Sequence, residues 1–208
     1  MLVVNKIFEQ KIIFFSPIRT GSTYIWNILN KYYYFDIPKH HSLKNINLNK
    51  FYIVTIRNPL DSIISSATRY DITLTSQNVN KYINEYLEEG GKDILNLDLK
   101  LDNVLLLKYE DFVDNEEYIS KNLINFLQIS FKRRLRSIIK KFNIENVNNI
   151  SKKFDSFNEY DTKTHIHGKH ISDTKGLSVY KYLDKKVVDL IIADENIAKI
   201  ITKFNYKI

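Results

Sequence analysis

The chain has 208 residues, of which 44% are hydrophobic, 26% are charged, five are glycine and three are proline. This balance is typical of an ordered globular protein, and the length favours a single domain spanning residues 1–208. The formal net charge of +7 indicates an anionic partner without selecting its class, and the absence of cysteine excludes disulfides, thiolate metal sites and a cysteine nucleophile.

The apolar runs are too short for a transmembrane helix. The longest of them, 12–15 and 187–192, fall far short of the ~20 residues that span a bilayer. Charged residues interrupt the N-terminus before a secretory apolar region can form. We therefore expect a cytoplasmic protein without a membrane span.

Three short runs of apolar, β-branched and aromatic residues predict buried strands at 11–15, 51–56 and 104–109. The first two runs are each followed by a loop and a stretch of helical spacing, and a longer helix is expected farther on, interrupted or bent at Gly90-Gly91. The helices predicted in this half cover residues 22–32, 60–69 and 79–97.

The second half of the chain is predicted to be helical around one loop. Helical spacing covers residues 116–127, 131–142 and 183–204, and a loop containing glycine and histidine spans 162–178. Strands alternating with helices predict a three-layer α/β domain with a mostly parallel central sheet flanked by helices. Because ligands bind at the carboxyl ends of such strands, the loops 17–23, 57–59 and 110–113 are the candidate site.

Two of these loops carry groups that suit anions. Residues 16–23 combine a glycine, a cation and several hydroxyls between a strand and a helix, whose N-terminus attracts negative charge. The segment lacks the second glycine and the lysine of a Walker A loop. An ordinary turn in which Ser22 or Thr23 caps the helix is the alternative. Arg57 at the end of the next strand and Ser65, about two helical turns later, are placed to hold a second phosphate.

At these two loops the sequence resembles the sulfotransferases that use 3′-phosphoadenosine 5′-phosphosulfate (PAPS). Their first motif, [KR]-[ST]-G-[ST]-T-W, is matched by residues 19–24 with Tyr24 in place of Trp, and their second, R-[ND]-P-x-D-x-x-x-S, is matched in full by residues 57–65. The resemblance implies a P-loop-NTPase-like domain. Ile18, which separates Pro17 from Arg19, departs from the family pattern.

The resemblance also implies roles for individual residues. Arg19 would stabilise the charge that develops as the sulfate leaves, and Arg57 with Ser65 would bind the 3′-phosphate. The 5′-phosphosulfate would be held by Thr20, Gly21, Ser22 and Thr23. Tyr24 and Tyr109 would contact adenine. Near the C-terminus only Lys175 and Gly176 match a further cofactor-binding segment of the family, where Lys169-His170 is an alternative source of a missing cation.

The resemblance places the catalytic base in Lys39-His40-His41, with His41 as the base and Lys39 as a supporting cation. Two alternatives remain open. Asp36 or Glu110 can serve as the base, or the two histidines are ordinary surface loop residues.

Three further groups have simple structural interpretations. His165, His167 and His170 allow a metal site, but the sequence offers no fourth ligand, and no metal is expected. The basic stretch 132–141 predicts a solvated helix face with Phe131, Leu135, Ile138, Ile139 and Phe142 packed inward; steering of an anionic ligand is its functional alternative. The tyrosines 32–34 predict packing rather than a sugar platform.

These observations predict a sulfotransferase. It would move a sulfuryl group from PAPS to the hydroxyl of a glycan, lipid or small metabolite by in-line displacement, releasing adenosine 3′,5′-bisphosphate (PAP) without a metal. The alternatives are a nucleoside or metabolite kinase of the same fold, which would need Mg²⁺ and ATP, and a non-catalytic nucleic-acid-binding module, which would bind in a strongly salt-dependent way.

Overall fold

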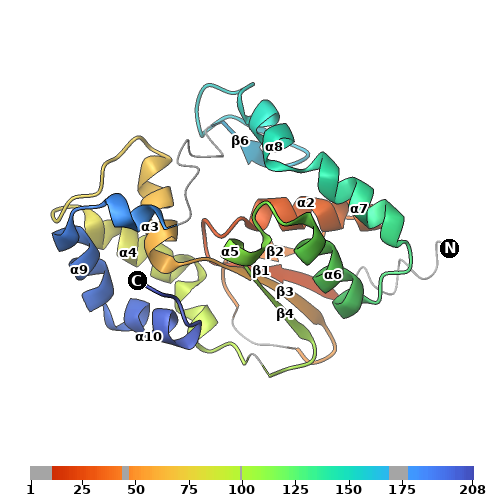
Figure 1. Ribbon diagram of the computed structural model, residues 1–208, viewed down its shortest axis with the longest axis horizontal. Helices are drawn as coiled ribbons and strands as arrows, with labels where there is room; N and C mark the ends of the chain where they lie inside the picture. Colours follow the sequence, from red (N-terminus) through yellow and green to blue (C-terminus); the bar gives the residue numbers. More distant parts are fainter. Residues whose placement is uncertain (1–10, 44–46, 99, 169–177) are drawn as a thin grey trace.

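A parallel sheet forms the centre of the protein. The computed structural model describes residues 11–43, 47–98, 100–168 and 178–208. In this part of the chain the sheet has the order β2(Lys39–His40), β1(Ile12–Phe15), β3(Phe51–Ile56), β4(Val104–Lys108), and neighbouring strands run parallel (Figure 1). The register pairs Phe14 with Ile53 and Val54 with Leu106.

Helices cover both faces of the sheet. One face packs against α2(Ser22–Tyr33), α6(Glu116–Leu127) and α7(Lys132–Lys141), and the other against α3(Pro59–Thr68), α4(Val79–Tyr86), α9(Lys185–Ala193) and α10(Glu195–Lys203). Each face forms its own hydrophobic core. Along β3, Ile53 belongs to the core on the α2 side and Val54 to the core on the α3 side. Both faces of the strand are therefore buried, which explains its continuous run of apolar and β-branched residues.

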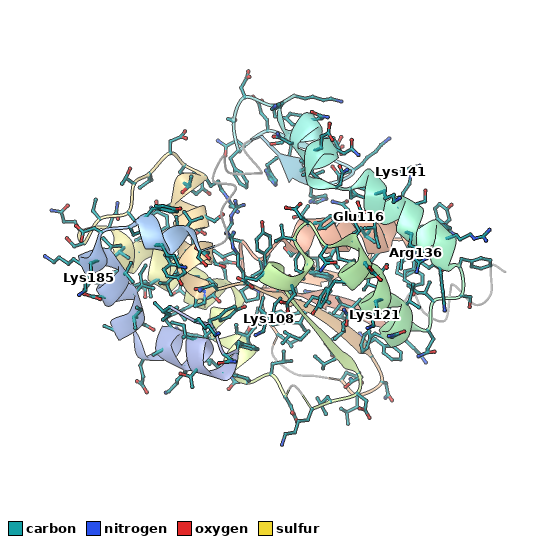
Figure 2. The ribbon with its side chains drawn as sticks, in the orientation of Figure 1. Lys108, Glu116, Lys121, Arg136, Lys141 and Lys185 are labelled. Atoms are coloured by element: carbon teal, nitrogen blue, oxygen red, sulfur yellow. The ribbon has the colours of Figure 1, made fainter. Side chains whose placement is uncertain are left out.

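Short elements join these layers. They are a π-helical turn at Leu87–Gly91, a 3₁₀ turn at Asp93–Leu95, α5(Tyr109–Phe112), α8(Ile144–Ser151), the antiparallel hairpin of β5(Tyr160–Asp161) and β6(Ile166–His167), and a 3₁₀ turn at Val179–Tyr182. The side chains between the layers fill the two cores (Figure 2). Among the described helices, none combines the length and the apolar character that crossing a membrane requires.

The predicted α/β architecture is confirmed, with three differences in its elements. The expected helix 183–204 is two helices, because the Asp194 side chain accepts hydrogen bonds from the backbone N–H groups of Asn196 and Ile197 and caps a new helix. The helix that starts at Val79 ends at Tyr86, since Glu89 and Gly90 take non-helical backbone angles. Tyr109 belongs to α5 and not to the preceding strand.

Candidate active site

The loop between β1 and α2 has an unusual backbone. Arg19 and Gly21 have φ angles of 63° and 72°, in the left-handed region. That conformation costs a residue with a side chain about 1–2 kcal/mol and often marks a functional loop. The buried Thr20 fixes the turn, because its hydroxyl bonds to the Pro17 carbonyl oxygen at 3.1 Å and to the Thr55 hydroxyl at 2.8 Å.

The start of α2 lacks a side-chain cap. Gly21 is the N-cap residue, and no side chain caps the first turn. The alternative of an ordinary turn capped by Ser22 or Thr23 is therefore wrong. Uncapped N–H groups at a helix N-terminus favour an anionic ligand.

One hydrogen bond brings the two sequence motifs together. Arg19 Nε donates to Ser65 Oγ at 3.0 Å, which joins the loop after β1 to the second turn of α3. Ser65 is 8% exposed, so this contact lies inside the protein at the carboxyl ends of β1 and β3.

Arg57 lies beside a group of aromatic rings. Its guanidinium carbon is 4.4 Å from the centroid of the Tyr109 ring, and its Nε is buried without a hydrogen-bond partner. The ring of Tyr109 packs so closely on Gly21 that a Cβ there would lie 2.7 Å from Tyr109 Cδ2. Tyr24 and Tyr109 both contact Phe112, with ring centroids 6.4 and 5.5 Å from it. The two predicted adenine contacts therefore flank one ring.

Strand β2 and the residue that follows it supply the remaining predicted groups. Lys39 Nζ donates to Thr23 Oγ1 at 3.2 Å, and His41 Nδ1 donates to the Ser16 carbonyl oxygen at 2.7 Å. Because a carbonyl oxygen only accepts, neutral His41 carries its proton on Nδ1 and leaves Nε2 as a proton acceptor. Burial lowers the pKa of His41, and the nearby charge of Lys39 lowers it further, so the imidazole is neutral at pH 7.

The backbone around His41 is closely packed. A Cβ on Gly90 would lie 2.6 Å from the His41 carbonyl oxygen, so the π-helical turn packs closely against the chain just after β2. His40, by contrast, is exposed. The two histidines thus occupy different surroundings, and the interpretation of both as surface residues fits His40 alone.

The site concentrates positive charge. Burial lowers the pKa of Arg19 to about 9, helped by the charges of Arg69 and Arg57, and burial lowers the pKa of Lys39 to about 8, helped by Arg19 and Arg69. Within the described residues no carboxylate forms an ion pair with any of these four groups. An anion bound here would supply the missing countercharge.

Two nearby carboxylates accept hydrogen bonds from backbone N–H groups. Glu110 accepts a hydrogen bond from the Asn58 N–H at 2.8 Å, and Asp61 accepts from the N–H groups of Ser178 and Tyr180, both at 3.1 Å. Asp36, the other alternative base, is exposed. The Asp of the second motif thus anchors the C-terminal segment to α3.

The structure adds residues that the sequence did not single out. Arg69 follows Ser65 by four residues, which puts both on one helix face, and its guanidinium carbon lies 3.8 Å from the centroid of Phe157. That spacing was a usable signal for Arg69. The place of Phe157, in contrast, depends on a hairpin far along the chain, for which the sequence offers no local signal.

Other predicted residues lie elsewhere. Lys175, Gly176, Lys169 and His170 fall outside the described residues. His167 stacks on Phe157 with ring centroids 4.2 Å apart, and His165 meets the edge of Trp26 at 5.1 Å. In the described ranges no group of three potential metal ligands is found.

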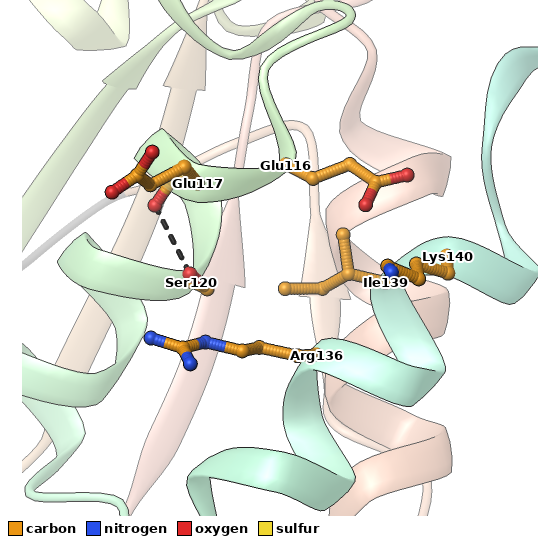
Figure 3. A pocket seen from close by; sticks show the side chains of 6 residues that line it. All are labelled: Glu116, Glu117, Ser120, Arg136, Ile139 and Lys140. Atoms are coloured by element: carbon orange, nitrogen blue, oxygen red, sulfur yellow. Dashed lines mark hydrogen bonds between the residues drawn. The ribbon is translucent and has the colours of Figure 1, made fainter.

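The basic helix α7 mostly packs as predicted. Leu135, Ile138 and Ile139 are buried, but Phe131 is 53% exposed, because it precedes the first turn of the helix instead of lying on its inner face. Tyr32 and Tyr33 are buried, whereas Tyr34 is 72% exposed. Between α6 and α7 a hollow of about 380 Å³ opens at the surface, lined by Glu116, Glu117, Ser120, Arg136, Ile139 and Lys140 (Figure 3). None of these residues belongs to the site described above.

The comparisons with known proteins agree with the architecture. No family model and no curated protein matches the sequence. Among solved structures, the chain is similar to mouse sulfotransferase SULT7A1 complexed with PAP, with a TM-score of 0.57, 14% identity, and coverage of 94% of this chain and 89% of that chain. The protein has a sulfotransferase-type fold. At this identity the similarity concerns the fold alone.

Proposed function

We propose that the protein is a PAPS-dependent sulfotransferase that acts on an acceptor hydroxyl. The observation that carries the proposal is the hydrogen bond of Arg19 to Ser65, which joins the two motifs into one cationic site at the ends of β1 and β3. The fold and the PAP complex of the similar mouse enzyme support the same cofactor.

The cationic loop fits a phosphosulfate. Arg19, Lys39 and the uncapped start of α2 surround one region and lack a carboxylate partner in the described residues. These groups would hold the 5′-phosphosulfate, with the hydroxyls of Ser22 and Thr23 and the backbone of Thr20 and Gly21. The buried, unpaired Nε of Arg57 is a donor for the 3′-phosphate, and Tyr24 and Tyr109 would border the adenine. Lys175 and Gly176 stay a prediction.

Each residue then has a chemical task. PAPS supplies the activated sulfuryl group. His41 takes the proton of the acceptor hydroxyl on Nε2, so that the oxygen can attack sulfur in line with the bond that breaks. Arg19 and Lys39 offset the negative charge that develops on the departing phosphate oxygen, in surroundings where burial strengthens the interaction.

Calorimetric titration with PAP, AMP and ATP in the absence of metal tests the proposal. We expect binding that requires the 3′-phosphate and is lost in Arg57→Ala. Arg133→Ala, a charge removed from the exposed side of α7, is the matched control and should bind PAP like the wild type. Equal binding of ATP that depends on Mg²⁺ would favour a kinase, and salt-sensitive binding of RNA or DNA without PAP binding would favour a nucleic-acid module. A cytoplasmic location stays a prediction from the sequence.

A further inference from the structure

The hairpin of β5 and β6 connects the two helices that begin at the site. On one side the Asn27 side chain of α2 donates to the carbonyl oxygen of Thr164 at 2.7 Å. On the other side Phe157, which precedes β5, packs on Arg69 at the end of α3. In Figure 1 β6 lies above α2 and to the right of α3. Residues 157–167 therefore bridge α2 and the end of α3, and we call this segment the wall.

Aromatic packing holds the guanidinium of Arg69, at the end of α3, against that wall. Its central carbon lies 3.8 Å from the centroid of Phe157, and the opposite partner of Phe157 is His167, whose ring is parallel to it within 6°. Tyr70 meets Phe157 edge-on at 6.0 Å and is 50% exposed. The cation is thus held against rings whose outer edge reaches solvent.

Arg69 has unused hydrogen-bonding capacity. Its Nε is buried without a partner, and within the described residues no carboxylate forms an ion pair with it. A buried donor without a partner is costly, and a planar guanidinium suits a carboxylate or sulfate. The combination indicates a ligand that is itself an anion.

Arg69 lies on the side of the catalytic base. Its charge lowers the pKa of Lys39, of His41 and of Arg19, whereas Arg57 lowers only the pKa of Arg19 among these three groups. The two guanidiniums also pack on different elements, since Arg57 lies on the ring of Tyr109 in α5 and Arg69 on the ring of Phe157 before β5. Arg57 belongs to the nucleotide motif, and Arg69 lies near His41, to which an acceptor would bring its hydroxyl.

We propose that Arg69, held in place by Phe157, binds an anionic group of the acceptor, so that the acceptor is a hydroxyl compound bearing a carboxylate or a sulfate. The proposal rests on the proposed sulfotransferase function. In the reaction the acceptor oxygen forms the new bond to sulfur, its proton passes to His41, the bond from sulfur to the PAP oxygen breaks, and the anion on Arg69 stays unchanged.

The test separates the acceptor side from the nucleotide side. Arg69→Met should weaken PAP binding much less than Arg57→Ala does, because Arg69 lies outside the nucleotide motif, whereas Arg57→Ala should lose PAP. The PAP-saturated protein is then titrated with p-nitrophenyl β-D-glucuronide and p-nitrophenyl β-D-glucoside, which differ by a carboxylate. We expect the glucuronide to bind at least about tenfold more tightly than the glucoside. One charge-assisted hydrogen bond between Arg69 and the carboxylate accounts for a difference in affinity of that size.

Three variants assign that preference to the proposed wall. Arg69→Met should remove the preference and leave glucoside binding unchanged, and Arg69→Lys should retain part of it. Phe157→Ala should reduce it and Phe157→Tyr restore it, since Phe157 positions the guanidinium. Arg133→Met, with an exposed side chain, is the control.

The outcomes distinguish the two proposals. If PAP binds but both glycosides bind equally, or neither binds, the acceptor inference is overturned and the proposed function stands. If Arg69→Met loses PAP as strongly as Arg57→Ala, Arg69 belongs to the nucleotide site and the inference is likewise overturned. If the wild type does not bind PAP, the proposed function itself fails.

Discussion

His41 has its tautomer set by the backbone. The Ser16 carbonyl oxygen accepts from Nδ1, so Nε2 is the only ring nitrogen that can take a proton in the neutral state. The resemblance selects His41 over His40, but the sequence does not show how the surroundings of the two residues differ. In the structure His41, just after β2, is partly buried, whereas His40 in the strand is exposed.

Replacement of His41 tests its assignment as the base. His41→Ala should lower kcat by about 10²–10⁴-fold, the usual contribution of a general base, and leave the affinity for PAP unchanged. His40→Ala is the matched control, since that neighbour is exposed. Normal turnover by His41→Ala would assign the proton transfer to another group.

The pH profile of the reaction follows from two lowered pKa values. His41 must be neutral to act, and burial holds its pKa below the ordinary value of 6.5. On the acid side, activity should therefore fall only when the pH drops below 6.5. Lys39 must be protonated, and its pKa of about 8 in the free protein predicts a second loss of kcat/KM as the pH rises through about 8. The profile of Lys39→Met should lack the limb near pH 8 and keep only a loss near pH 9, where Arg19 titrates; a limb that stays near pH 8 in this variant would contradict the assignment.

At the scale of elements, Asp61 ties the start of α3 to the 3₁₀ turn at Val179–Tyr182. Its side chain is 2% exposed and accepts from the backbone of Ser178 and Tyr180. The motif spacing identifies Asp61, but the resemblance suggests no task for it. Its partners lie more than a hundred residues away, and no local pattern reveals them.

Loss of the Asp61 charge should therefore be a stability defect. Asp61→Asn keeps the shape but replaces one accepting oxygen with a donor that faces backbone N–H groups, so we expect a loss of about 1–3 kcal/mol in urea unfolding. Asp189→Asn, at an exposed position in α9, should change stability by less than about 0.5 kcal/mol. Equal stability of the two variants would mean that the Asp61 contacts contribute nothing net.

Other elements show where local patterns lose their predictive power. The apolar spacing of residues 183–204 continues through Asp194, and the pattern therefore predicts one helix. The capping bonds of Asp194 end α9 and start α10 despite that continuity. The strands were easier to predict, because runs such as Phe51–Ile56 are apolar on both faces and end at motifs with turn residues.

At the scale of the whole molecule, the buried cations oppose folding in the absence of an anion. The pKa of Lys39 is lowered from 10.5 to about 8 in the folded state, so between these two pH values the unfolded chain binds more protons at this group. The free energy of unfolding therefore rises as the pH increases from about 8 to 10.5. Below that range Lys39 stays charged at a cost, which a bound anion relieves.

PAP should therefore stabilise the protein strongly at neutral pH. At a concentration of about a hundred times its Kd, mass action contributes about 2.7 kcal/mol, which corresponds to a rise in Tm of roughly 5–10 °C for a chain of this size. Differential scanning fluorimetry with PAP, and with AMP as the control, measures the shift. The effect should vanish in Arg57→Ala, and an equal shift with AMP would argue against a 3′-phosphate site.

The hairpin that bridges α2 and α3 also determines when the complete site can form. Its bond to Asn27 spans 137 residues, and the anchor of Tyr180 on Asp61 spans 119. Loops of that length close late in folding, because their entropy must be lost before any contact repays it. A nascent chain can thus form the loop after β1 early, yet it gains the hairpin proposed to help bind the acceptor only when the last third has folded. Turnover is consequently a more stringent measure of complete folding than nucleotide binding.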